Sequence, residues 1–186
     1  MRIVGGLHRG RTISAPAGVI ARPTTDRVRE ALFSILTSRD DVSFEDARVI
    51  DLFAGSGALG LEAMSRGASF CLFVEENAAA RGAIRENADS LGLVGSTRIH
   101  RRSAISLGQR PTSAGDPFSI AFLDPPYGKG LADKALEELT CGWLADKAII
   151  VVEQGAKEPP ASATNFLETD RRQYGDTQIG LYCFSA

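Results

Sequence analysis

The sequence predicts a doubly wound α/β domain built on a mostly parallel sheet. From Arg48 onward, short apolar runs alternate with segments of helical spacing, which is the pattern of strands joined by crossover helices. The run at 48–52 leads into a glycine-rich stretch, and the run at 118–123 leads into Asp124-Pro-Pro-Tyr127. Both segments therefore follow predicted strands, at the edge of an open sheet where ligands bind.

The apolar runs define the expected strands and the periodic segments define the helices. We expect strands at 48–52, 70–74, 97–100, 118–124 and 148–152. Helices are expected at 58–66, 78–91 and 131–139, with a short helix at 105–107. Two final strands, at 165–172 and 178–184, are joined by a turn and not by a helix, which predicts that the last strand is antiparallel.

A small extension precedes the sheet. Residues 2–4 and 11–14 are predicted to form a hairpin, and Thr25-Asp26 is expected to cap a helix that ends near Thr37. We therefore divide the chain into an N-terminal basic extension, residues 1–40, and a ligand-binding α/β domain, residues 41–186.

The composition is that of an ordinary globular protein, with 44% hydrophobic and 24% charged residues among 186. The sequence has no apolar run of the roughly 18 residues that a membrane span needs. Its first residues also lack the apolar core of a signal peptide, so we expect a cytoplasmic protein with no membrane association. Three widely spaced cysteines suit reduced thiols, and the two isolated histidines do not suggest a metal site.

Charge is distributed unevenly along the chain. The first 29 residues hold six arginines and one aspartate, a net charge of +5, so the remainder carries −7 of the total of −2. Arginines without lysine suit bidentate contacts to phosphate, although a solvated charged face is the alternative. The candidate nucleic-acid contacts are Arg9, Arg11, Arg22, Thr24, Arg27 and Arg29.

The glycine-rich stretch predicts a site for an adenosine-containing cofactor. Gly55 and Gly57 belong to a G-x-G-x-x-G pattern, in which glycines let the backbone approach a ligand at a helix N-terminus. Glu75, after the second strand, can accept hydrogen bonds from ribose hydroxyls. Asp51 would repel a pyrophosphate but attract the ammonium and sulfonium of S-adenosylmethionine, which favours that cofactor over NAD. The residues expected beside the adenine are Ser103 and Ala104.

The Asp124-Pro-Pro-Tyr127 corner predicts a pocket for a planar amine. The prolines hold the chain extended and lack N–H groups, so ladder pairing cannot continue. The Asp124 carboxylate and the Pro125 carbonyl could accept hydrogen bonds from an amino group, while Tyr127 stacks on the attached ring. The alternative is a strand that merely ends in an Asp-Pro turn.

Together, these motifs resemble the class I, S-adenosylmethionine-dependent methyltransferases that act on exocyclic amines. Arg2-Ile-Val-Gly-Gly, Arg22-Pro-Thr-Thr-Asp26 and Tyr174-Gly-Asp-Thr177 are similar to one branch, the RsmD-like 16S ribosomal RNA guanine-N2 methyltransferases of bacteria. The resemblance implies a seven-stranded Rossmann-like sheet, a methyltransferase domain at 41–186 and S-adenosylmethionine as methyl donor. It also implies a guanine in 16S rRNA as substrate, presented on a small-subunit ribosomal particle and contacted by residues 1–40.

The resemblance leaves other functions open. The same Asp-Pro-Pro-Tyr corner serves adenine-N6 methyltransferases acting on DNA, and nothing in its four residues separates guanine from adenine. A Rossmann NAD-dependent oxidoreductase and a catalytically silent RNA-binding factor are further alternatives. We expect no metal in the reaction and a monomeric protein.

Overall fold

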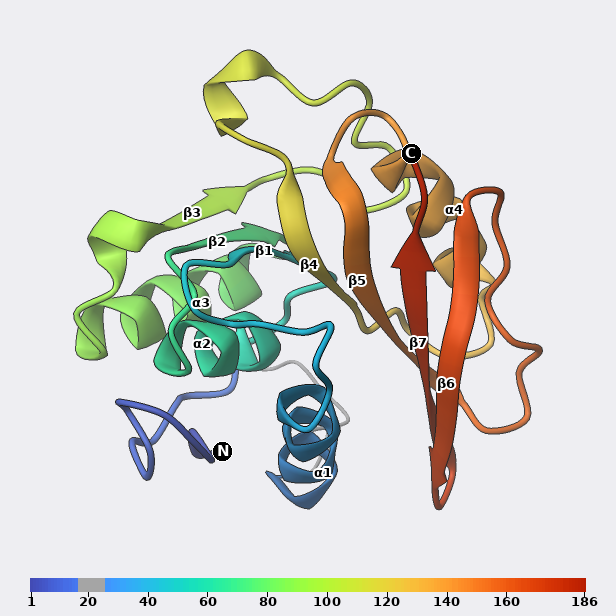
Figure 1. Ribbon diagram of the computed structural model, residues 1–186. Coiled ribbons are helices and arrows are strands. Elements are labelled where there is room, and N and C mark those ends of the chain that lie inside the picture. Colours follow the sequence, from blue (N-terminus) through green and yellow to red (C-terminus); the bar gives the residue numbers. More distant parts are fainter. Residues whose placement is uncertain (17–25) are drawn as a thin grey trace.

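The computed structural model describes residues 1–16 and 26–186 (Figure 1). Seven strands form one sheet in the order β3-β2-β1-β4-β5-β7-β6. The strands are β1 (Arg48–Leu52), β2 (Phe70–Val74), β3 (Thr97–His100), β4 (Phe118–Leu123), β5 (Leu144–Gly155), β6 (Phe166–Tyr174) and β7 (Thr177–Phe184). The helices are α1 (Asp26–Thr37), α2 (Ala58–Ser65), α3 (Ala78–Ser90) and α4 (Leu131–Leu139), with short 3-10 helices η1 (Val94–Ser96) and η2 (Thr112–Ala114).

The strand directions confirm the predicted fold class. The first five strands pair in parallel, whereas β7 is antiparallel to both of its neighbours, β5 and β6. The strand order reverses between β1 and β4, because β2 and β3 lie on one side of that pair and β5 on the other. Open α/β sheets bind ligands at the carboxyl ends of the strands at such a switch point.

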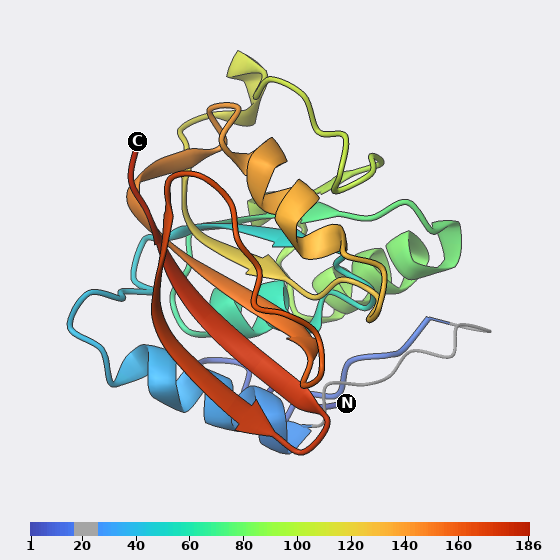
Figure 2. The ribbon, with the colours of Figure 1, turned by 90° about the vertical axis from the view of Figure 1, so that its right-hand side faces the viewer.

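Helices cover both faces of the sheet. The buried side chains of α1, α2 and α3 share one hydrophobic cluster, and those of α4 belong to a second cluster on the other face (Figure 2). In α4 the buried residues recur at helical spacing, which explains why this segment forms an amphipathic helix. They are Ala132, Ala135, Leu136 and Leu139.

The helix of the N-terminal extension is part of the main core. In α1, Leu32 and Leu36 are buried together with Phe33, whose ring centroid lies 5.6 Å from that of Phe122 in β4. Phe33 also packs against Phe44, with ring centroids 5.4 Å apart. Each such burial contributes about 1.5–3 kcal/mol, so α1 stabilises the sheet on which it lies.

Several predicted elements differ in detail. The expected hairpin is present but short: its arms pair at one antiparallel bridge, Arg2↔Thr12, and the Ile3 N–H donates to the Arg11 carbonyl over 2.9 Å. The turn between the arms docks on α2, where the Leu7 N–H donates to the Ser65 carbonyl over 2.7 Å. The expected helix at 105–107 is wrong: Ser106 closes a turn by donating to the Ser103 carbonyl. The fifth strand begins at Leu144, because an irregularity before Ile149 lets it pair with β4 earlier than predicted.

No helix within residues 1–16 and 26–186 is both long and apolar enough to cross a membrane.

Candidate active site

The glycine-rich turn after β1 is held by the two acids predicted to bind a cofactor. The Gly55 N–H donates to Glu75 Oε2 over 2.9 Å, and the Gly60 N–H donates to Asp51 Oδ2 over 2.9 Å. The second Glu75 oxygen accepts from the Asn77 N–H over 2.7 Å. The acids and the turn therefore lie together at the carboxyl ends of β1 and β2.

Local backbone geometry explains the residue types in this turn. Phe53 has a φ of 61°, a left-handed conformation that is rare for an aromatic residue and is typical of strained functional turns. Gly57, which precedes α2, has a φ of 78°. A Cβ at Gly60 would lie 2.4 Å from the Phe73 ring and 2.6 Å from Cys71 Sγ, so this glycine permits α2 to pack closely on β2.

Asp51 is a buried acid, 2% exposed, beneath the turn. Burial raises its pKa to about 8; the Gly60 N–H offsets part of this rise, and the negative charge of Glu75 adds to it. A positive ligand group beside the carboxyl would lower that pKa again. The electrostatics of this half of the edge therefore favour a cationic ligand.

Asp124 occupies the equivalent place after β4. Its backbone is next to β1, with the Asp124 N–H donating to the Leu52 carbonyl over 3.5 Å, and Pro125 beside it is buried. Burial, then the charge of Glu153, then that of Asp51 raise the pKa of the Asp124 carboxyl. Asp124 is therefore close to acids from the strands on both sides.

Glu153 was not predicted as a site residue. The pairing of Leu123 with Val152 places Asp124 and Glu153 next to each other on adjacent strands. Glu153 ends the apolar run of the fifth strand, so its sequence signal is the same as that of Asp124. Among the described residues, no three His, Cys, Asp or Glu side chains are arranged as metal ligands.

Tyr127 is anchored by two strands that lie far away in the sequence. Its hydroxyl donates to Glu153 Oε1 over 2.8 Å and lies 3.0 Å from Thr177 Oγ1. The ring lies over β5, because a Cβ at Gly155 would be 3.4 Å from it. Thr177 was also missed as a site residue, although it ends the Tyr174-Gly-Asp-Thr177 motif on which the resemblance partly rests.

The predicted adenine contacts follow β3, on the Glu75 side of the sheet. Glu75 itself donates its N–H to the carbonyl of His100, the last residue of β3. Ser103 is partly exposed, whereas the Ala104 side chain is 4% exposed and belongs to a hydrophobic cluster. Only the backbone of Ala104 is therefore suited to a ligand contact.

The predicted nucleic-acid contacts separate into three groups. Arg9, Arg11 and Arg27 are exposed. Arg29 is fully buried, 2.9 Å from Asp26 and 3.8 Å from Glu62, so its guanidinium neutralises acids of the protein and is not available to phosphate. The remaining two, which lie outside the described residues, are Arg22 and Thr24.

The extension is joined to the glycine-rich turn through one buried side chain. Asn87 of α3 accepts from the Ser14 N–H over 2.7 Å and donates to the Ser14 carbonyl over 3.0 Å. The same amide donates to the carbonyl of Ser56 in the turn over 3.0 Å. Asn87 therefore links Ser14 of the N-terminal extension to the glycine-rich turn through hydrogen bonds.

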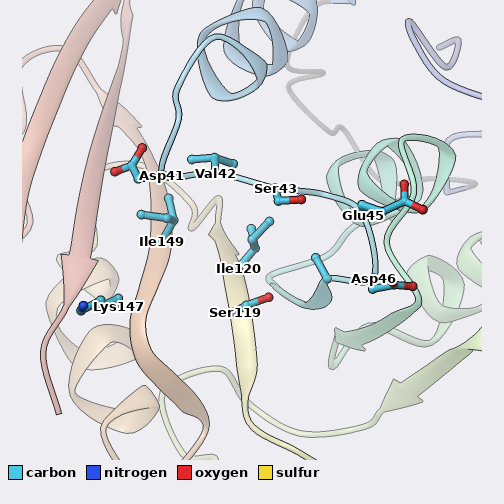
Figure 3. Close-up of a pocket in the computed structure, with 10 residues that line it drawn as sticks. Asp41, Val42, Ser43, Glu45, Asp46, Ser119, Ile120, Lys147 and Ile149 are labelled. Atoms are coloured by element: carbon cyan, nitrogen blue, oxygen red, sulfur yellow. The ribbon is translucent and has the colours of Figure 1, made fainter.

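A pocket of about 300 Å³ lies at the opposite edge of the sheet (Figure 3). It is bordered by the connection before β1, by Ser119 and Ile120 at the start of β4, and by Lys147 and Ile149 of β5. These are amino ends of strands, where ligands of open α/β sheets do not normally bind. The candidate active site is therefore the edge that carries Asp51 and Asp124.

The strand order, the turn after β1 and the corner after β4 define a class I methyltransferase fold. Residues 1–183 match the family described as "Conserved hypothetical protein 95", and the chain belongs to this family of RsmD-like methyltransferases.

Named relatives agree with this assignment. The chain is 43% identical over 155 residues to "Ribosomal RNA small subunit methyltransferase D" of Escherichia coli K12, covering 82% of this chain and 74% of that protein. It is 35% identical over 185 residues to "Putative rRNA methyltransferase YlbH" of Bacillus subtilis, covering 98% of both. The solved structure of "Putative methyltransferase yhhF" from Escherichia coli has a TM-score of 0.85 and 39% identity, covering 100% of this chain and 98% of that one.

Proposed function

We propose that this protein transfers a methyl group from S-adenosylmethionine to the exocyclic N2 of a guanine in bacterial 16S rRNA. One observation carries the proposal: a site that favours a cation, at Asp51, lies next to a corner that can hold an amine, at Asp124, across the β1–β4 switch point. The names of the relatives support rRNA as the substrate class.

The residues around the turn fit S-adenosylmethionine. Within residues 1–16 and 26–186, a Cβ at Gly55 would have only the Phe53 carbonyl oxygen within 4 Å, at 3.9 Å, so these residues leave room for a ligand against the backbone of the turn. Asp51 would face the positive groups, and the second lone pairs of the Glu75 oxygens would accept from ribose hydroxyls. When bound, the cofactor supplies an electrophilic methyl group on a positively charged sulfur. The residues that would border the adenine are Ser103 and the backbone of Ala104.

The corner supplies orientation and hydrogen-bond acceptors. The guanine amine is a weak nucleophile because its lone pair is delocalised into the ring. Hydrogen bonds from its protons to the Asp124 carboxylate and the Pro125 carbonyl would localise that pair, and Asp124 would take up the proton that the nitrogen loses. Stacking on Tyr127, worth about 1–3 kcal/mol, would offset part of the few kcal/mol needed to unstack the base.

In this proposal residues 1–40 hold the rRNA while the domain at 41–186 carries the reaction. Arg9 and Arg27 are exposed and would contact phosphate, as would the part of the Arg11 guanidinium that does not donate to the Ser90 carbonyl. Arg22 with Thr24 completes the proposed set. Arg29 is removed from it by its burial. The substrate would be a small-subunit ribosomal particle in the cytoplasm.

Transfer of radiolabelled methyl groups tests the function. The acceptors are small-subunit particles lacking the modification, naked 16S rRNA and DNA, each followed by nucleoside analysis. We expect N2-methylguanosine in the ribosomal samples. N6-methyladenine in DNA would instead support the alternative substrate, and the absence of methylated product with every acceptor would contradict methyl transfer.

A further inference from the structure

The ring of Tyr127 is placed by contacts at both of its ends. On the backbone side, two prolines precede it, and the chain then passes through Gly128 and Gly130. Both have positive φ, and no heavy atom of the described residues lies within 4 Å of a Cβ built on either. Residues 128–130 are exposed. The exposed segment after Tyr127 does not hold the ring; the ring lies against Gly155 of β5, and its hydroxyl end is held by side chains of β5 and β7.

The Tyr127 hydroxyl is held by two polar side chains, Glu153 of β5 and Thr177 of β7. Glu153 is 5% exposed within a buried strand, and its Oε1 accepts from the Tyr127 hydroxyl over 2.8 Å. Thr177 Oγ1 is 3.0 Å from the same hydroxyl. Gly155 and Thr177 are direct partners in the antiparallel β5–β7 ladder, so the two strands that hold the hydroxyl also hold each other.

Burying the Glu153 carboxyl costs free energy, so its use to hold the Tyr127 ring indicates that the position of this ring matters. Desolvating Glu153 beside Asp124 is unfavourable, and a hydrogen bond to a charged acceptor returns only part of that cost. A side chain of a binding or catalytic site must be held to within about 0.5 Å of its productive geometry by packing and by hydrogen bonds from surrounding residues.

We propose that Glu153 and Thr177 are positioning residues of the acceptor pocket, which hold the Tyr127 ring as the stacking surface for the target base. The inference rests on the proposed function, because the base is the ligand of that surface. Glu153 does not contact the base in this arrangement, and it acts through Tyr127.

The kinetics of variants test whether Glu153 and Thr177 position the Tyr127 ring. We expect Glu153→Ala to lower kcat/KM for transfer to the ribosomal acceptor by about 10–100-fold, because small displacements of a reacting group have effects of that size. Glu153→Gln keeps an acceptor oxygen for the hydroxyl and should stay within about threefold of the wild type. Thr177→Val, which removes the second contact, should have an intermediate effect. Glu137→Gln, an exposed change on α4, is the matched control.

A double-mutant cycle separates positioning from a general structural role. Tyr127→Phe removes the hydroxyl, so Glu153→Ala should cost little more in that background. Equal losses from Glu153→Ala in both backgrounds, or a Glu153→Gln variant as poor as Glu153→Ala, would overturn the inference.

A measurement that does not depend on catalysis keeps the two proposals distinguishable. The chain has three tyrosines, so labelling them gives a simple NMR spectrum in which Tyr127→Phe assigns the Tyr127 signals. We expect slow Tyr127 ring flips in the wild type and faster flips in Glu153→Ala. Wild-type protein that methylates no ribosomal acceptor would overturn the proposed function, whereas unchanged ring flips in Glu153→Ala would overturn the anchor.

Discussion

The candidate site at the carboxyl ends of the strands has two halves, whose contacts join residues at very different separations in the sequence. On the β1–β2 side, the bond between Gly60 and Asp51 joins residues nine apart, and that between Gly55 and Glu75 joins residues 20 apart. The glycine-rich turn and the two acids of this proposed cofactor half therefore lie within one strand–helix–strand unit, and only the proposed adenine contacts, Ser103 and Ala104, come later, after β3.

The acceptor half is completed only by the end of the chain. The Tyr127 hydroxyl contacts Glu153, 26 residues later, and Thr177, 50 residues later. Thr177 is in place only once β7 has paired with β5 in the antiparallel direction. The comparison teaches that the proposed cofactor site is held mainly by a local motif, whereas the proposed acceptor pocket depends on the pairing of β5 with β7.

Asp124→Ala should distinguish the two halves most clearly, because it should impair the acceptor half and leave the cofactor half intact. It removes the proposed acceptor for the amine, and losses of about 10²–10⁴-fold are typical when a proton acceptor is removed. We expect methyl transfer to fall at least that far while calorimetry with S-adenosylmethionine still shows binding. Asp89→Ala, an exposed change on α3, should leave both unchanged. Retained turnover in Asp124→Ala would contradict the proposed role of the corner.

The same comparison explains how much the sequence could predict. The cofactor half is recognisable because its glycines and acids occur within one short stretch and at the next strand end. Asp124 and Tyr127 are equally visible, since they share one motif. Thr177 is visible only as the end of the Tyr174-Gly-Asp-Thr177 motif, because its contact with the Tyr127 hydroxyl arises only when strand pairing brings the two residues together.

Arg29 was assigned wrongly for a related reason. Charge and composition made it one of a group of arginines, but helical spacing places it on the same side of α1 as Leu32, Phe33 and Leu36. Its acidic partner Glu62 is on α2, 33 residues away in the sequence. The count of charges along the sequence could not show this ion pair, because the packing of α1 against α2 brings Arg29 and Glu62 together.

Gly60→Ala should damage the cofactor half through stability. The new Cβ would lie 2.4 Å from the ring of Phe73, and overpacking of this kind costs about 1–3 kcal/mol. We expect a lower midpoint in chemical unfolding. Gly82→Ala is the control: Gly82 lies within α3, and no heavy atom of the part of the chain that the structure describes lies within 4 Å of the new Cβ, so this change should stabilise the protein by about 0.5–1 kcal/mol. A Gly60→Ala variant as stable as the wild type would mean that α2 does not need this close contact.

Asp51→Asn should improve stability while weakening the cofactor site. The pKa of Asp51 is about 8 in the folded protein, against the ordinary value of 3.8 for a solvated aspartate, so the folded state retains a proton that the unfolded state loses. Stability from this group is therefore present below about pH 4 and is lost as pH rises towards 8. The asparagine avoids that loss and can still accept from the Gly60 N–H.

Thermal unfolding at several pH values checks this. We expect the variant and the wild type to differ little near pH 4, and the variant to be more stable by a few kcal/mol near pH 9. S-adenosylmethionine should raise the midpoint of the wild type far more than that of the variant. A stability difference that does not grow between pH 4 and 8 would mean that Asp51 is not the titrating group.

Arg9→Glu should change neither the cofactor half nor the acceptor half of the candidate site directly, and it should weaken only the binding of rRNA. Each phosphate contact contributes about 0.7–0.9 to the slope of log affinity against log salt, so losing one contact should reduce the slope by about that amount. Lys147→Glu is the matched control, because this exposed lysine lies at the opposite edge of the sheet, beside the pocket in Figure 3. Titrations of 16S rRNA at several salt concentrations, with cofactor affinity measured in parallel, decide the outcome. Equal slopes for both variants would make Arg9 part of a solvated surface, and the role of residues 1–40 would then be to support α1 and the turn.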